Sequence, residues 1–131
     1  MNSTEPRHHD HRAIVLFAHG SSEPRWAEPF EALQNRLSER LPGVTVRLAF
    51  LERMPPGLGE VVEDLAKQGV KAIDVAPVFL ALGSHLREDL PRLIQSASAT
   101  HGVTIRVLPA IGEISTLLDA IADAYVTQHL R

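Results

Sequence analysis

Hydrophobic positions along the chain follow two alternating patterns: short apolar runs of strand length, and longer segments with apolar residues at helical spacing. Residues 13–18 form an apolar run of the kind found in buried strands. The segment that follows carries apolar side chains at helical spacing, namely Trp26, Phe30, Leu33, Leu37 and Leu41. Pro42 and Gly43 end that pattern. The first part of the chain is therefore predicted to be a strand followed by a helix.

The same alternation occurs three more times. A strand over residues 44–50 is followed by a helix with one apolar face, made of Leu58, Val61, Val62 and Leu65. A strand over roughly residues 72–80 precedes a helix that carries Leu90, Leu93, Ile94 and Ala97. A strand over residues 103–108 precedes a helix that carries Ile114, Leu117, Leu118, Ile121, Tyr125 and Val126. Four strand-helix units with short connections predict an α/β domain in which helices cover both faces of a parallel sheet.

The polarity of the four strands indicates their order in the sheet. The second strand alternates apolar residues with Thr45 and Arg47, and the fourth alternates them with Thr104 and Arg106, which is typical of edge strands. The first strand is apolar throughout and the third nearly so, as expected for strands buried on both faces in the middle of a parallel sheet. The predicted order is 2-1-3-4. Pro77 removes a ladder donor from the third strand, which predicts a bulge there.

Composition narrows the class of protein. With 131 residues, of which 44% are hydrophobic, the chain is expected to form one domain over residues 12–131, preceded by a mobile tail at residues 1–11. A formal charge of -3 gives no global basic field for nucleic acid or anionic membranes. The lack of cysteine excludes thiolate metal sites and leaves histidine and carboxylates as metal ligands. Without a signal-like start or an apolar run of about 20 residues, we expect a cytoplasmic protein.

His19 and His85 are the most informative polar residues. Each follows a strand-like run and lies in a Gly/Ser turn before a predicted helix. Ligands of open α/β sheets bind beyond the carboxyl ends of the strands, where the strand order reverses, and adjacent strands lie about 4.8 Å apart. Two neutral imidazoles there would bind a divalent ion and leave coordination positions open. The alternative is that each histidine only hydrogen-bonds its own turn, but the paired placement favours a shared site.

Charged residues near the predicted strand ends extend this site. Glu52 follows the second strand and is a candidate carboxylate ligand or general base, although a single acidic loop residue is commonly just solvated. Three arginines just beyond predicted strand ends suggest a cationic rim that binds carboxylates, and these are Arg25, Arg53 and Arg87. Ser22 is interpreted as a helix cap with Pro24 in the first turn. Asp89 is interpreted in the same way, as a cap of the helix that continues through Pro91.

The other histidines receive no catalytic role. A metal-capable cluster lies in the tail, made of His8, His9, Asp10 and His11. His101 and His129 are expected in a turn and at the chain end, with no evident partner.

Several motifs around the two histidines resemble those of a known family. They are AHGS at 18–21 with PRWAEPF at 24–30, AFLE at 49–52, and PVFL at 77–80 followed by GSHLREDLP at 83–91. In these segments, and over nearly the whole chain after the tail, the sequence resembles the small class II chelatases. This is the CbiX/SirB-like family of sirohydrochlorin cobaltochelatases and ferrochelatases.

The resemblance implies a chelatase fold in its short form, in which two copies pair as a homodimer to approximate the two halves of longer chelatases. It implies that His19 and His85 are the metal-binding, catalytic histidines, and that Glu52 is an acidic residue near the cavity. Ser21 and Ser84, in the turns that carry the two histidines, join the three arginines as candidate contacts of the tetrapyrrole.

One substrate contact of the family is missing from this sequence. Ser22 and Glu23 stand where many relatives carry Arg-Asp, so a cationic contact to the substrate is absent at this place.

The predicted function is insertion of a divalent metal into sirohydrochlorin, in cobalamin or sirohaem synthesis. Co²⁺ is the first expectation, with Fe²⁺ or Ni²⁺ as alternatives. The metal is a substrate, so no permanently bound cofactor is expected. Because imidazole binds metal only when unprotonated and has a reference pKa of about 6.5, we expect activity to fall in acid through this range.

Two other functions compete with this prediction. A histidine phosphatase would also place His-Gly after the first strand, but Ala18 stands where that family's motif has arginine. A non-enzymatic cobalt- or nickel-binding or metal-delivery module would use the same two histidines without touching a macrocycle. Binding of sirohydrochlorin distinguishes the chelatase from such a module.

Overall fold

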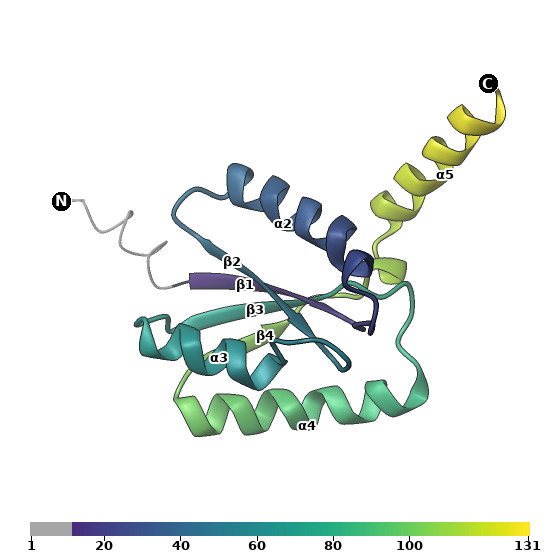
Figure 1. Cartoon of the computed structure of the whole chain (residues 1–131). Helices are drawn as coiled ribbons and strands as arrows, with labels where there is room; N and C mark the ends of the chain where they lie inside the picture. The colour runs from purple at the N-terminus through teal and green to yellow at the C-terminus, as the bar shows by residue number, and fades with distance from the viewer. Residues whose placement is uncertain (1–11) are drawn as a thin grey trace.

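The computed structural model describes residues 12–131, and the predictions about the tail at residues 1–11 lie outside this part of the chain. The strands are β1 (Arg12–Ala18), β2 (Thr45–Phe50), β3 (Ala72–Pro77) and β4 (Thr104–Val107). The helices are α2 (Glu28–Arg40), α3 (Leu58–Lys67), α4 (Ser84–His101) and α5 (Ser115–His129), with short 3-10 helices η1 (Pro24–Ala27) and η2 (Ile111–Glu113). Figure 1 shows their arrangement. No helix within residues 12–131 is long and apolar enough to cross a membrane.

All four strands are parallel and lie in the order β2-β1-β3-β4, which confirms the predicted order. The predicted bulge at Pro77 is wrong, because β3 keeps a regular register with β1 up to the pair of Phe17 and Pro77. On its other side β3 pairs with β4 only as far as Val75. Pro77 is therefore the last residue of its strand and leaves no β4 carbonyl without a donor.

The two faces of the sheet carry separate cores. Helices α3 and α4 cover one face, which we call the closed face, around Val15, Phe17, Ile73 and Val75. Helix α2 and η1 lie on the opposite face, over β1 and β2, and pack on Leu16, Ala18, Val46, Leu48 and Phe50. Strand neighbours alternate between these cores, as the period of two in a strand requires.

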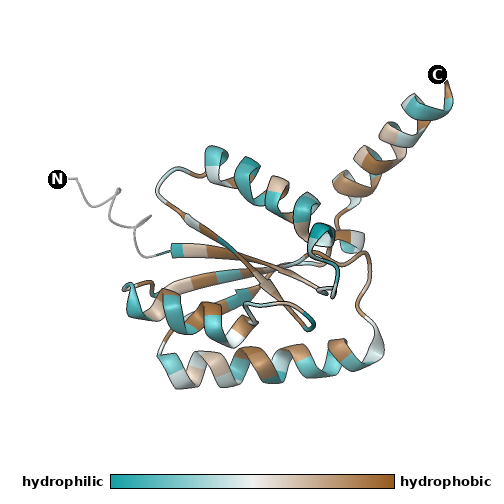
Figure 2. Ribbon diagram, viewed as in Figure 1, coloured by the Kyte–Doolittle hydropathy of each residue, from teal (hydrophilic) through white to brown (hydrophobic). Residues whose placement is uncertain are grey.

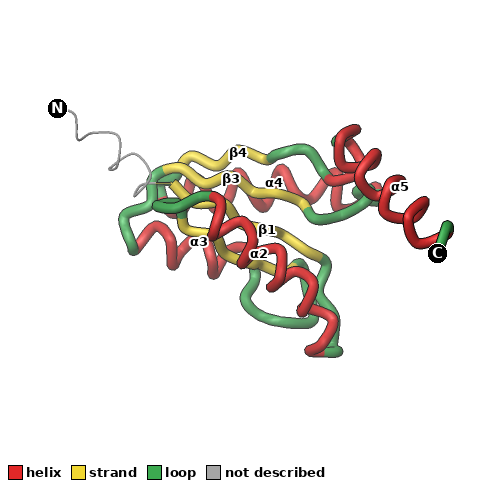
Figure 3. The backbone as a smooth tube through the Cα atoms, turned by 90° about the horizontal axis from the view of Figure 1, so that it is seen from above, coloured by secondary structure: helices red, strands yellow, loops and turns green. Residues whose placement is uncertain are grey.

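Helix α5 departs from the layered arrangement. It extends away from the sheet beyond the ends of the strands, and none of its residues is buried (Figures 1 and 3). Strand β3 alternates between buried and half-buried residues, so its predicted burial on both faces is wrong. The reason is that no helix of the described chain covers the α2 side of β3 and β4, which we call the open face (Figure 3).

Two capping predictions are also wrong. Helix η1 has Glu23 as its N-cap and no side-chain cap, and the Glu23 N–H donates instead to Ser21 Oγ at 3.0 Å. Helix α4 already begins at Ser84, after Gly83 in extended conformation, so Asp89 lies inside the helix. Pro91, which suggested a first turn, is also inside α4.

Candidate functional site

His19 is held at the end of β1 by the segment that follows β2. The N–H of Glu52 donates to the carbonyl of His19 at 3.1 Å, and the His19 Nε2 lies 2.9 Å from Glu52 Oε2. Gly20 makes this approach feasible, because its φ is +97° and a Cβ there would collide with the Glu52 carbonyl. The sequence His-Gly therefore fixes both the position of the imidazole and its carboxylate partner.

Glu52 contacts the His19 imidazole but does not itself line the cavity that the imidazole lines. A neutral His19 that donates Nε2–H to the carboxylate keeps Nδ1 as a free acceptor, with the ring orientation fixed. The Arg53 guanidinium lies 3.9 Å from the same carboxylate oxygen, and all three side chains are about half exposed or more. This geometry suits an imidazole that exchanges a proton or a metal ion with a bound molecule.

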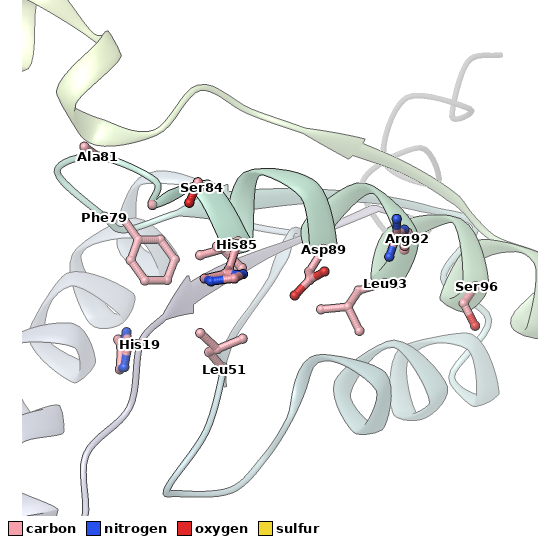
Figure 4. Close-up of a pocket in the computed structure, with 12 residues that line it drawn as sticks. His19, Leu51, Phe79, Ala81, Ser84, His85, Asp89, Arg92, Leu93 and Ser96 are labelled. Atoms are coloured by element: carbon pink, nitrogen blue, oxygen red, sulfur yellow. The ribbon is translucent and has the colours of Figure 1, made fainter.

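His85 reaches the site from α4. It is the second residue of the helix, and residues one to three turns further on lie along the same side, namely Asp89, Arg92, Leu93 and Ser96 (Figure 4). Within residues 12–131 the His85 side chain has no hydrogen-bond partner, so both ring nitrogens are available to a ligand.

Both histidines line one cavity of about 760 Å³. Its walls are largely apolar, with Leu51, Phe79 and Leu86 packed at the same time against the core of the closed face. The Phe79 ring meets His19 edge to face, with ring centroids 6.3 Å apart (Figure 4). The predicted convergence of two imidazoles on one space therefore holds, and the space is a continuation of the closed-face core.

Of the five residues predicted to contact the substrate, only one lines the cavity. Ser84 lines the cavity, whereas Ser21 accepts the hydrogen bond from Glu23. Arg25 is in η1, Arg53 follows β2, and neither lines the cavity. Arg87 lies on another side of α4, where it lines a groove of about 580 Å³ and donates to the Leu82 carbonyl at 3.4 Å.

Asp89 and Arg92 line the cavity but were missed in the sequence. The signal was their spacing of four and seven residues from His85, which places them on one side of a helix that begins before His85. Reading Asp89 as a cap moved the helix start past His85 and hid this pattern. Within residues 12–131 no three His, Asp or Glu side chains form a metal-binding group. The two histidines therefore offer an open pair of ligands.

One histidine follows β1 and a second follows β3, and both line the same cavity. The protein is therefore a parallel α/β protein with a two-histidine site at the carboxyl end of its sheet. Residues 13–128 match the family model CbiX. The chain belongs to the CbiX family, which confirms the family resemblance.

Relatives of this family are named sirohydrochlorin cobaltochelatase. The protein of Methanocaldococcus jannaschii is 36% identical over 89 residues, which is 68% of this chain and 62% of the relative. That of Methanosarcina barkeri is 36% identical over 81 residues, or 62% of each chain. The matched part thus spans about three fifths of the length of these relatives.

Two solved structures share the fold. The putative cobalamin (vitamin B12) biosynthesis CbiX protein of Marinobacter aquaeolei VT8 is 41% identical, with a TM-score of 0.81 over 91% of this chain and 97% of that one. The sirohydrochlorin chelatase SirB of Bacillus subtilis subspecies spizizenii, solved in complex with cobalt, is 24% identical with a TM-score of 0.73. The match covers 86% of this chain and 48% of SirB.

Proposed function

We propose that this chain inserts a divalent metal ion into sirohydrochlorin, with Co²⁺ as the first expected ion and Fe²⁺ or Ni²⁺ as alternatives. The observation that carries the proposal is that His19 and His85, from separate elements, line one largely apolar cavity. Support comes from relatives named sirohydrochlorin cobaltochelatase that are 36% identical to this chain. The product would serve cobalamin or sirohaem synthesis, and the metal is a substrate, not a resident cofactor.

The reaction replaces two pyrrole N–H protons of the macrocycle by one M²⁺ ion and releases two protons. The ion must lose part of its water shell, approach one face of the ring and find proton acceptors nearby. His85 has no partner in the described chain and is suited to bind the incoming ion. His19, oriented by Glu52 at 2.9 Å, is suited to accept a pyrrole proton and pass it to solvent. The two imidazoles thus take different parts of one reaction.

The cavity walls fit a flat macrocycle with acidic substituents. Leu51, Phe79 and Leu93 offer apolar surface to the ring. Arg92 is placed to hold a peripheral carboxylate in a two-point contact. Asp89, one turn along α4 from His85, adds a negative charge that attracts the cation.

A homodimer and a cytoplasmic location belong to the same proposal. Two copies would approximate the two halves of longer chelatases, consistent with the chain covering 48% of SirB. The cytoplasmic location rests on the sequence alone and stays a prediction.

The test is anaerobic metal insertion followed by the absorbance of sirohydrochlorin, with each of the three ions and an enzyme-free control. We expect His19→Ala and His85→Ala each to lose about 100-fold or more of the rate, the usual contribution of a positioned acid-base or ligand group. His101→Ala is the matched control, because it removes an imidazole from the opposite end of α4. If folded wild-type protein binds Co²⁺ but neither accelerates insertion nor changes the sirohydrochlorin spectrum, the metal-delivery function replaces this one.

A further inference from the structure

The segment between β3 and α4 forms one wall of the cavity without belonging to a helix or a strand. Within residues 78–83, the cavity is lined by Phe79, Ala81 and Gly83. Most of this segment is hydrophobic, as Figure 2 shows. Leu80 is nevertheless 63% exposed, so its side chain does not anchor the segment in a core. The position of this wall therefore depends on contacts made by its backbone.

The 3-10 turn η2, which follows β4, makes two of these backbone contacts. The N–H of Ile111 donates to the Phe79 carbonyl at 3.1 Å. Gly112 lies so close to the Leu80 carbonyl that a Cβ there would collide with it. Only glycine, which has no Cβ, allows this approach. The turn thus meets two successive carbonyls of the cavity wall.

The turn η2 is itself held in place. The N–H of Leu108 donates to the Val75 carbonyl at 2.8 Å, so the chain is tied to β3 shortly before the turn begins. Ala110 is 2% exposed, and its N–H donates to Glu113 Oε1 at 3.1 Å. The N–H of Glu113 donates back to the Ala110 carbonyl at 2.9 Å. The turn is therefore a fixed support for the wall rather than a loop that moves with it.

Phe79 connects this wall to the catalytic histidine of β1. Its ring meets the ring of Phe17 edge to face, with centroids 5.9 Å apart, and it meets the His19 ring in the same way at 6.3 Å. Phe17 is 1% exposed and fixed in the closed-face core, whereas the His19 side chain is about half exposed. Figure 4 shows Phe79 beside His19 in the cavity. The imidazole is thus held by Glu52 at one nitrogen and by Phe79 at its ring.

We propose that η2 positions the His19 imidazole through Phe79. Gly112 and the backbone N–H of Ile111 are then positioning groups for metal insertion, although neither residue lines the cavity. An imidazole that accepts a proton from a bound ring must keep its orientation, and a small misplacement of a reacting group lowers the rate strongly. The effect on rate rests on the proposed function, whereas the effect on the position of His19 does not.

The test removes one N–H from η2. Ile111→Pro replaces this N–H by a ring Cδ that collides with the Phe79 carbonyl. Proline suits the position, because Ile111 is the first residue of the turn and Ala110 before it has φ of -65° and ψ of 157°. Ile111→Ala is the matched control, since it shortens the same side chain and keeps the N–H.

A second variant acts on the other carbonyl. Gly112→Ala pushes a Cβ against the Leu80 carbonyl and so displaces the same wall. Its control is Gly59→Ala, because nothing lies within 4 Å of a Cβ at that position.

Steady-state metal insertion gives the first readout. We expect Ile111→Pro and Gly112→Ala each to lower kcat by about 10-fold, with the KM for sirohydrochlorin changed by less than about twofold. The KM is spared because Leu51, Leu86 and Leu93 still offer the ring an apolar wall. The two control variants should keep kcat within about twofold of wild type.

Proton NMR of the His19 ring gives a readout that needs no reaction. Its two carbon-bound ring protons, identified by their loss in His19→Ala, experience the ring current of Phe79. We expect these resonances to move in Ile111→Pro and Gly112→Ala and to stay in place in both controls. A wild type that inserts no metal refutes the proposed function, and the resonances then decide alone whether η2 positions His19.

The proposal is overturned if Ile111→Pro matches Ile111→Ala in both kcat and the His19 resonances. Circular dichroism and light scattering show beforehand whether each variant keeps the fold and the molar mass of wild type. If one of the two variants does not, the other decides against its own control. Loss of the fold in both would show that η2 supports the whole domain rather than His19, and would also overturn the proposal.

Discussion

The closed and open faces of the sheet differ in how deeply they bury the side chains of the same strand. In β3 the side chains of Ile73 and Val75 are 1% and 0% exposed on the closed face, while Ala76, the next residue, is half-buried on the open face. The cavity belongs to the closed face, since Leu51, Phe79 and Leu86 are part of both its wall and that core. The chain therefore completes by itself the face that positions the two histidines. It leaves open, in the described chain, the face that contributes no residue to their cavity.

The largest contrast is expected from the same change at neighbouring residues of β3. Val75→Asp places an unpaired carboxylate in the closed-face core and should lower the free energy of unfolding by about 4 kcal/mol, a large part of the stability of a domain. Ala76→Asp reaches solvent on the open face and should cost about 1 kcal/mol in the monomer. Urea unfolding followed by circular dichroism measures both. Equal losses at the two positions would mean that the open face is packed in the single chain.

A smaller effect is expected where the closed face meets the site. Gly20→Ala forces a Cβ against the Glu52 carbonyl at a φ of +97°, and should cost about 2 kcal/mol of unfolding free energy as well as metal-insertion rate. Gly59→Ala is the control, because nothing lies within 4 Å of a Cβ there, and alanine favours the helix by up to about 0.5 kcal/mol. Urea titrations of the two variants should shift in opposite directions. A neutral Gly20→Ala would show that the loop after β2 yields easily and does not hold His19.

The strand order could be predicted because central strands are more apolar than edge strands. The polar residues of β2 and β4 placed them at the edges, and this order brought His19 and His85 to one end of the sheet. The same argument failed at β3. Its even-numbered residues are small or charged, as Ala76 and Asp74 show. They were predicted to be buried, but burial also requires a helix over that side of the strand, and the composition of the strand does not show whether one is present.

Helix α5 shows the physical limit of such reasoning. Its spacing of apolar residues correctly predicted a helix, but none of its residues is buried in the described chain. Periodicity does not tell whether the apolar side of a helix packs on its own chain or on another copy, because both give the same pattern. In the site, Asp89 and Arg92 were missed for a related reason. Their roles depend on where α4 begins, and element boundaries are the least certain part of a pattern.

A change of about tenfold is expected from the carboxylate that orients His19. Glu52→Gln keeps the size of the side chain but offers a weaker acceptor to the imidazole 2.9 Å away, and loss of such a partner typically costs about 10-fold in activity. The loss should be in kcat, with the KM for sirohydrochlorin nearly unchanged, because Glu52 does not line the cavity. Glu63→Gln, which removes the partner of Lys67 on the solvent side of α3, is the matched control. A loss confined to KM would instead assign Glu52 to substrate binding.

The smallest expected effect is a difference in how the two sheet faces respond to salt concentration. The closed-face core holds no buried polar or charged residue in the described chain, whereas the open face exposes Arg12, Lys71 and Arg106. Raising NaCl from about 0.05 to about 0.5 M should therefore weaken the proposed homodimer by about threefold where it contacts this face, since contacts of exposed charges are screened over this range. The same salt should leave the urea midpoint of the chain at high dilution almost unchanged, because the closed-face core contains no charge to be screened. Sedimentation equilibrium at the two salt concentrations measures the first quantity. A dimer that tightens with salt would show that apolar contacts alone hold the two copies together.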